Sequence, residues 1–221
     1  MAVVRAPRIS LAGTGALLLD GAQGPFDEAI QELVWAVAKA ARSLEGVRET
    51  VPGMNNLLVL FDPLATDALS VGEQLKSLWT GTDAHTIDGT LHTISVSYGG
   101  SRGEDLACWA AHCGLSLEET VSRHAAATYT VAAIGAMPGF PYLSGLDPRL
   151  AWPRRRSPRL KVAEGAVIIG GAQAGIMPMT APSGWHIIGH TDARLVDVQS
   201  QSPVLLRPGD RIRFEIAGIE K

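Results

Sequence analysis

The chain changes its sequence pattern near residue 128, and this change limits the possible folds more than any other feature. Up to residue 98, short apolar runs alternate with segments whose apolar residues recur every three or four positions, as in alternating strands and helices. After residue 128, short apolar runs are separated by Pro and Gly, which favours a β-barrel or sandwich. The sequence therefore predicts an α+β protein with an α/β domain over residues 1–90 and an antiparallel β-domain over residues 91–221.

The first domain is predicted to have the ferredoxin-like order of strands and helices. In its first helix, Ile30, Leu33 and Val37 share one face, and a face of this kind packs on a core. The expected elements, in the order strand, helix, strand, strand, helix and strand, are residues 16–19, 25–44, 47–51, 57–61, 70–79 and 91–98. This order is the split βαβ arrangement.

A helical insert is predicted to precede the β-domain. One helix is expected over residues 105–112, and a second is expected to begin after Ser116 and to end near Ala126. Ser116 and Glu119 have the spacing of a capping box, in which the Ser side chain caps the first turn. The strands expected in the β-domain are residues 128–134, 166–169, 186–188, 194–198, 204–206 and 211–216.

Charge and cysteine content exclude several classes of protein. The chain of 221 residues has 19 basic and 22 acidic residues, so it lacks the basic excess of a general nucleic-acid or membrane-surface binder. Cys108 and Cys113 are its only cysteines, which rules out a disulfide scaffold and fits a reducing compartment. No apolar run reaches 18 residues, the length that indicates a membrane span. We therefore expect a soluble, cytoplasmic protein.

A basic segment over residues 149–161 is a candidate anion-binding site. It contains six basic residues in 13 positions and no acidic residue. Pro153 and Pro158 stiffen the segment, and Arg side chains bind carboxylate or phosphate with two parallel hydrogen bonds. A stiff basic loop beside the mouth of a barrel would hold an anionic substrate. The alternatives are a solvated loop or a patch that docks on an acidic partner.

Two aromatic features are candidates for the walls of a pocket. Residues 137–142 form an apolar loop bracketed by prolines, in which Phe140 is the central aromatic residue; ordinary loop packing is the alternative. Trp185 follows a turn and leads into a strand, where it either stacks on a ligand or fills the barrel. Both residues would exclude water from a bound substrate.

Motifs for nucleotide, serine hydrolase and metal chemistry are missing or weak. Residues 170–175 are rich in Gly, but the chain has no P-loop motif, so only Gln173 is retained there as a ligand-orienting residue. Ser183 has no nucleophile-elbow context. The pairs of His and Cys residues lack the spacing of a zinc site, and no metal is expected. His124 near a helix end is either structural or a general acid–base.

The ordered set of motifs resembles a known family over almost the whole chain. The motifs are Tyr98-Gly99-Gly100, Asp105-Leu106, His124, Tyr129, residues 138–143, Pro153-Arg154, residues 157–159, Gln173 with Gly175-Ile176, Gly184-Trp185, Ile188-Gly189 and residues 208–210. Together they resemble the 5-oxoprolinase B-subunit family, also called allophanate hydrolase subunit 1 or KipI-like carboxyltransferase subunit.

The resemblance implies a cyclophilin-like β-barrel and a function within a complex. Members act with a homologous larger C-subunit and, in 5-oxoprolinase, with a third component, the A-subunit, and ATP hydrolysis drives the opening of 5-oxoproline to glutamate. ATP would be used by the complex, because this chain has no nucleotide motif of its own. The resemblance leaves two alternatives: an inhibitor of a sensor histidine kinase, or a carboxyltransferase component of a urea or allophanate system.

Within this resemblance, each candidate residue receives an expected role. Arg154 and Arg159 would hold carboxylate or phosphoryl oxygens, and Gln173 would orient the amide. His124 would relay a proton. Phe140 and Trp185 would line the substrate site.

Five positions depart from the residues that family members commonly show. They are Ala136 instead of Phe, Met177 instead of Tyr, Ser183 instead of Gly, His190 instead of Arg and Asp192 instead of Pro. Loss of a Tyr hydroxyl and an Arg guanidinium removes two polar contacts, each worth ~1–3 kcal/mol when buried. The departures therefore bear on the substrate and on catalysis, and not on the fold.

Overall fold

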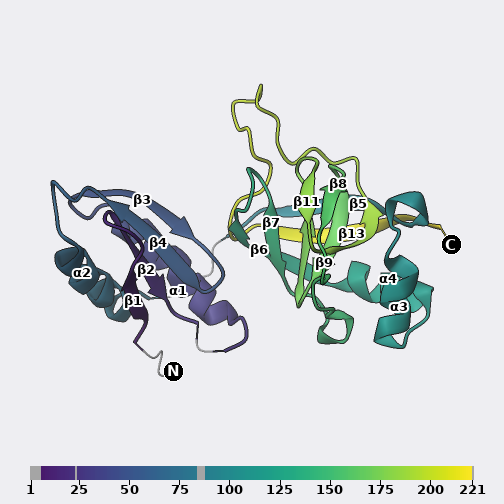
Figure 1. The fold of residues 1–221 in the computed structure, drawn as a ribbon, viewed down its shortest axis with the longest axis horizontal. Coiled ribbons are helices and arrows are strands. Elements are labelled where there is room, and N and C mark those ends of the chain that lie inside the picture. Colours follow the sequence, from purple (N-terminus) through teal and green to yellow (C-terminus); the bar gives the residue numbers. More distant parts are fainter. Residues whose placement is uncertain (1–5, 23, 84–87, 221) are drawn as a thin grey trace. The chain divides into compact units, whose positions relative to one another are not determined.

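Each half of the chain has its own hydrophobic core. The computed structural model describes residues 6–22, 24–83 and 88–220. Contacts divide the chain into two units, residues 1–87 and 88–221, which are drawn in Figure 1. No buried residue is shared between the core of the first unit and the cores of the second.

The first unit is a four-stranded antiparallel sheet with two helices. Its strand order is β1-β2-β4-β3, and α1 and α2 pack against the sheet and against each other. Its elements are β1 (Arg8–Leu11), β2 (Ala16–Asp20), α1 (Glu28–Ala41), β3 (Val47–Pro52), β4 (Asn56–Phe61) and α2 (Ala68–Gly81). Asp side chains cap both helices, since Asp27 accepts from the Ile30 amide and Asp67 from the Ser70 amide.

One strand predicted for this sheet belongs elsewhere. Residues 91–98 were expected as the last strand of this sheet, but its fourth strand is β1, which forms a hairpin with the adjacent β2. The expected segment forms β5 (Leu91–Gly99), which instead pairs along its whole length with β13 (Arg211–Glu220) in the second unit. The spatial order of the split βαβ fold is kept, because the N-terminal strand takes the place of the last one.

The second unit is a closed seven-stranded barrel in the order β10-β7-β6-β13-β5-β12-β9. All neighbouring pairs are antiparallel except β5 and β13, which run parallel. Strands β8 and β11 form a separate two-stranded ribbon. The remaining elements are α3 (Leu106–Cys113), α4 (Leu117–Ala126), β6 (Thr128–Ile134), β7 (Pro141–Ser144), β8 (Arg159–Val162), β9 (Ala166–Gly170), β10 (Gln173–Ile176), β11 (Ala181–Ser183) and β12 (His186–His190).

Predictions for the second unit were correct where the local signal was strong. The Ser116 hydroxyl caps α4 by accepting from the Glu119 amide at 3.0 Å. Residues 194–198 and 204–206 are not strands, and only one isolated bridge joins Val196 to Val204. The short strands β7, β8, β10 and β11 were not predicted, because Gly and Pro residues within or beside them resemble loop punctuation.

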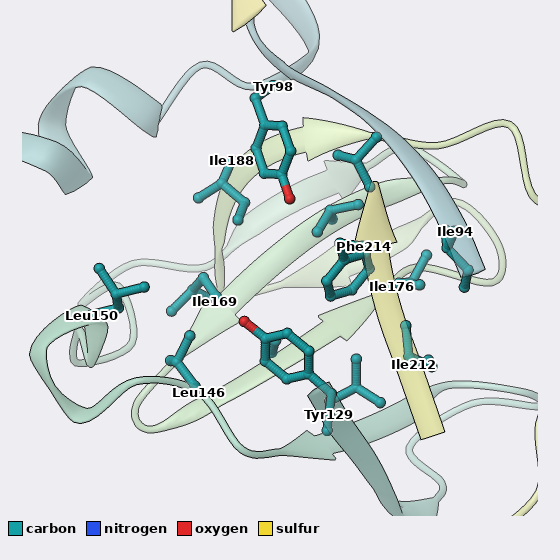
Figure 2. Packing of buried hydrophobic residues seen from close by; sticks show 14 of the residues in the cluster. Ile94, Tyr98, Tyr129, Leu146, Leu150, Ile169, Ile176, Ile188, Ile212 and Phe214 are labelled. Carbon is teal, nitrogen blue, oxygen red and sulfur yellow. The ribbon is translucent and has the colours of Figure 1, made fainter. Parts of the chain in front are cut away.

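The main core of the second unit fills the barrel. All seven strands contribute buried residues to one cluster, and Figure 2 shows Tyr98, Tyr129 and Phe214 among them. Helices α3 and α4 add Trp109 and Val121 to this cluster. A smaller cluster contains Phe140, Ile168, Met177, Trp185 and Ile187, with Val162 and Ala166. The barrel interior is therefore packed with side chains. The smaller cluster is separate from this interior core.

Candidate functional site

A pocket of about 290 Å³ lies against the outer face of the barrel wall. Successive residues of a strand point to opposite faces of a sheet. Along β9, Val167 and Ile169 belong to the barrel interior, whereas Ala166 and Ile168 belong to the smaller cluster. The pocket shares three residues with that smaller cluster. Its lining is Ala136, Met137, Phe140, Tyr142, Arg154, Arg155, Pro158, Met177, Pro182, Ser183, Gly184 and Trp185. These shared residues place the pocket on the side of the barrel, whereas the basic loop was expected beside the barrel mouth.

Three aromatic rings form the apolar wall of the pocket. The ring of Phe140 lies edge-on to those of Tyr142 and Trp185, with centroids 5.0 Å and 5.6 Å away. Such edge-to-face pairs are favoured by the ring quadrupoles. Phe140 and Trp185 are buried, and Tyr142 is partly exposed. The loop over residues 137–142 thus contributes to a pocket wall, and Trp185 does not fill the barrel interior.

Two glycines make room for these rings. A Cβ atom on Gly170 would collide with the indole of Trp185, and one on Gly175 would lie 2.9 Å from the ring of Phe140. Both glycines belong to the hairpin of β9 and β10. The Gly-rich segment over residues 170–175 therefore accommodates aromatic side chains and is not a phosphate cradle.

Arg154 and Arg155 bring positive charge to the pocket. The Arg154 guanidinium lies over the Trp185 ring, 5.3 Å from its centroid, in a cation–π contact. The Arg155 amide donates to the Gly184 carbonyl at 2.8 Å, which joins the basic segment to the turn before Trp185. Arg155 was not predicted as a site residue, because the sequence does not show which of several adjacent arginines points into a pocket.

Arg159 is used in a different way from the one predicted. Two of its nitrogens donate to the two carboxylate oxygens of Asp105 at 2.8 Å and 2.9 Å, and its Nε lies 2.9 Å from Glu104. The bonds to Asp105 raise the pKa of the Arg159 guanidinium. Arg159 is not among the described residues that line the pocket. Its guanidinium nitrogens are thus occupied by carboxylates of the protein, and the predicted grip of Arg159 on an anion stays a prediction without support from this geometry.

His124 lies inside the protein and not in the pocket. Its ring has no exposed surface, its Nδ1 is hydrogen-bonded to the Tyr98 hydroxyl at 2.8 Å, and it stacks on Phe214 at 4.8 Å. Burial lowers the pKa of His124 to about 3. A neutral imidazole enclosed in this way has no access to a substrate, so the structure argues against the predicted proton relay.

Gln173 and the positions that depart from the common family residues differ in whether they line the pocket. Gln173 begins β10 and does not line the pocket within the described part of the chain. Ala136, Met177 and Ser183 all line it. His190 lies elsewhere, with Nδ1 3.0 Å from Arg102 and 3.6 Å from Asp192. Three of the five departures from the common family residues therefore change the pocket itself.

The described residues offer no metal site or membrane span. Across residues 6–22, 24–83 and 88–220, no three His, Cys, Asp or Glu side chains are grouped to bind a metal ion. Cys108 and Cys113 are both free thiols. In the same residues, no helix has the length and apolar character needed to cross a bilayer.

The chain is a carboxyltransferase-type domain by its match to a family model. Residues 7–206 match the family model described as carboxyltransferase domain, subdomain C and D. The same fold occurs in the urea amidolyase of K. lactis, with a TM-score of 0.81 over 96% of this chain and 15% of that chain, at 18% identity. The crystal structure of TTHA0988 has a TM-score of 0.78 and 33% identity, over 91% of this chain and 40% of that longer chain.

Sequence similarity identifies the family within this class. The chain is 42% identical over 207 residues to the 5-oxoprolinase B-subunit of Escherichia coli O157:H7, and the match covers 94% of both chains. The chain belongs to the 5-oxoprolinase B-subunit family.

Proposed function

We propose that this chain is the B-subunit of an ATP-dependent complex that opens 5-oxoproline to glutamate, and that the outer pocket binds 5-oxoproline. The observation that carries the proposal is the pairing of an aromatic wall with two guanidinium groups in a pocket of about 290 Å³. 5-Oxoproline is a small, flat lactam ring with one carboxylate. The ring would pack against Phe140 and Trp185, and the carboxylate would bind Arg154 and Arg155.

Three lining residues that differ from the common family residues affect the substrate specificity of the proposed site. Met177 and Ala136 make the pocket lining apolar where a polar or larger residue is common in the family, while Ser183 adds one hydroxyl where Gly is common. A lactam can still be recognised by backbone groups and guanidinium donors. The sequence relatives, which carry the name of the 5-oxoprolinase B-subunit, favour 5-oxoproline over other amides as the substrate.

ATP would be bound by another component of the complex. The sequence contains no P-loop motif, and Gly170 and Gly175 of the hairpin of β9 and β10 pack against aromatic rings. No step of ATP hydrolysis is therefore assigned to the described residues of this chain.

The partners proposed are a homologous larger C-subunit and a third component, the A-subunit. Exposed residues close in sequence to the pocket lining support the binding of a partner near the pocket. Leu160 is 89% exposed and Met179 is 46% exposed, and Arg156 is also exposed. Exposed apolar side chains and exposed basic charge in this part of the sequence fit a partner surface with apolar and acidic residues. Closure of the pocket by a partner would exclude water from the lactam.

Reconstitution of the complex tests this proposal. The chain is co-purified with its neighbouring gene products, and 5-oxoproline-dependent release of glutamate is measured with and without ATP. We expect ATP-dependent turnover, and we expect Arg154→Ala to raise the KM for 5-oxoproline by about 10- to 100-fold, because it removes a charged hydrogen bond worth ~1.5–3 kcal/mol.

Arg149→Ala is the matched control, since Arg149 is an exposed Arg of the same basic segment that does not line the pocket. Its KM should equal that of the unmodified complex. An equal rise of KM in both variants would contradict binding of the carboxylate in this pocket. Turnover that is abolished by avidin would instead indicate biotin-dependent carboxyl transfer.

A further inference from the structure

We infer that Asp105 is a positioning residue that holds Arg155 at the pocket wall and fixes the start of the strand that follows Trp185. Asp105 itself is not among the described residues that line the pocket. The inference rests on the proposed function, since it assigns Asp105 a role in the binding of the 5-oxoproline carboxylate through another residue.

The first observation is that Asp105 does not do what its place in the sequence predicts. It occupies the N-cap position of α3, where an Asp side chain normally accepts a hydrogen bond from the first turn, but it makes no such bond. Its Oδ2 accepts instead from the Ile187 amide at 2.8 Å. Its own amide donates to the Ile187 carbonyl at 2.9 Å. Asp105 is thus joined by two hydrogen bonds to β12, two residues after Trp185.

The second observation is that the same carboxylate is shared by two arginines. Arg159 uses both of its terminal nitrogens on Asp105, whereas Arg155 makes a single longer contact of 3.5 Å to Oδ1. Among the described residues, the Nε of Arg155 is buried and has no hydrogen-bond partner. All three guanidinium nitrogens of Arg159 are therefore bound to carboxylates of the protein, whereas the guanidinium of Arg155 is held by one long contact and lines the pocket.

The third observation is that this carboxylate is ionised and largely buried. The Asp105 side chain is only 9% exposed. Burial by itself raises the pKa of Asp105, but the bonds from Arg159 and from the Ile187 amide outweigh it, so that its pKa lies below the usual value. A charged group that these donors hold in a fixed place is a suitable anchor for a flexible Arg side chain.

Removal of the negative charge should release Arg155. Two guanidinium groups that share one carboxylate would repel each other if that carboxylate became neutral. Arg159 would still be held by Glu104, at 2.9 Å from its Nε. Arg155 has no other acidic partner among the described ion pairs, so it is the group expected to move away from the pocket.

Kinetics of the reconstituted complex test this inference by a double-mutant cycle. We expect Asp105→Asn to raise the KM for 5-oxoproline about tenfold with a change of less than threefold in kcat, and Arg155→Ala to do the same. The double variant should show no larger rise than either single variant, because both act through one contact. Multiplying effects, or a normal KM for Asp105→Asn, would overturn the inference.

Asp147→Asn is the matched control. Asp147 also occupies a helix-cap position and also pairs with an Arg, since its Oδ2 lies 3.2 Å from Arg123, but it is not among the described residues of the lining. If Asp105 had a merely structural role, Asp105→Asn would lower the melting temperature without a change in KM, which is the result expected for the control. If Asp105→Asn does not fold, Arg155→Ala decides alone, and a normal KM for it overturns the inference.

A structural readout separates this inference from the proposed function. If the unmodified complex turns over no 5-oxoproline, the proposed function fails, and a crystal structure of the Asp105→Asn chain still reports the position of Arg155. Displacement of the Arg155 side chain from the pocket, with Arg159 still beside Glu104, supports the positioning role. An unchanged Arg155 side chain contradicts it.

Discussion

The surroundings of His124 show how completely a residue's neighbours can decide its chemistry. Four aromatic side chains contact its ring, from Tyr98, Trp109, Tyr129 and Phe214. Its Nε2 is buried, and no residue in the described part of the chain bonds to it. Burial without a charged neighbour favours the neutral imidazole. His124 therefore acts as an aromatic core residue that also satisfies the hydroxyl of Tyr98.

This burial predicts a pH dependence of stability. The pKa of His124 is lowered from 6.5 to about 3 in the folded protein, so below pH 6.5 the unfolded chain binds a proton that the folded chain does not. The free energy of unfolding should fall as the pH falls from 6.5 towards 3, by about 2 kcal/mol between pH 6.5 and 5. Urea unfolding at several pH values measures it.

The variant His124→Asn isolates this contribution. Asn retains a polar group near the Nδ1 position for Tyr98 but does not titrate. His186 also has a pKa lowered by burial, so both proteins should lose stability in acid, with the smaller loss in the variant. Equal losses in the two proteins would show that His124 is protonated in the folded state.

The hairpin of β9 and β10 is the element that shapes the pocket. Its glycines lie under Trp185 and Phe140, and its other side packs in the barrel through Val167, Ile169 and Ala174. A strand with Gly at such a position usually marks a close approach by another group. Here that group is an aromatic ring, and the geometry of the pocket depends on it.

Gly170→Ala should therefore disturb both stability and the pocket. The added methyl group overlaps the indole of Trp185, and overpacking of this kind costs ~1–3 kcal/mol. We expect a lower free energy of unfolding together with a changed near-ultraviolet circular dichroism spectrum, which reports the Trp environment.

Gly72→Ala is a control with the opposite sign. Gly72 lies within α2, and a Cβ atom there would make only an ordinary contact of 3.8 Å with Leu17. Ala is preferred over Gly inside a helix by ~1 kcal/mol. This variant should gain stability and keep the spectrum, whereas a gain for Gly170→Ala would contradict the packing described for Trp185.

Over the whole molecule, the separate cores indicate two folding units. Every residue that lines the outer pocket belongs to residues 88–221, and so do all seven strands of the barrel. A domain with its own core can fold alone. The pocket should therefore persist without the first unit.

A fragment of residues 88–221 tests this expectation. It should unfold in one cooperative transition in urea and retain the near-ultraviolet spectrum of the barrel, because its core is complete. The full chain serves as the reference. Binding of a hydrophobic dye to the fragment, with loss of that spectrum, would mean that the barrel needs the first unit to fold.

Local patterns in the sequence were enough for elements whose signals lie within a few residues. The stripe of Leu33 and Val37 predicted α1, and the spacing of Ser116 and Glu119 predicted the start of α4, because these signals act within one or two helical turns. The motifs that resemble the family also led to the correct fold class, because the whole set occurs in the family's order along almost the entire chain.

Pairing between residues far apart in the sequence is visible only in the tertiary structure. Strand β5 pairs with β13, more than 100 residues later, which moved it from the sheet to the barrel. Asp105 pairs with Arg155 and Arg159, about 50 residues later, and only Arg155 of these two lines the pocket. Neither choice has a local signal, because hydrogen-bond partners and the two faces of a barrel wall are set by three-dimensional proximity and not by neighbouring residue types.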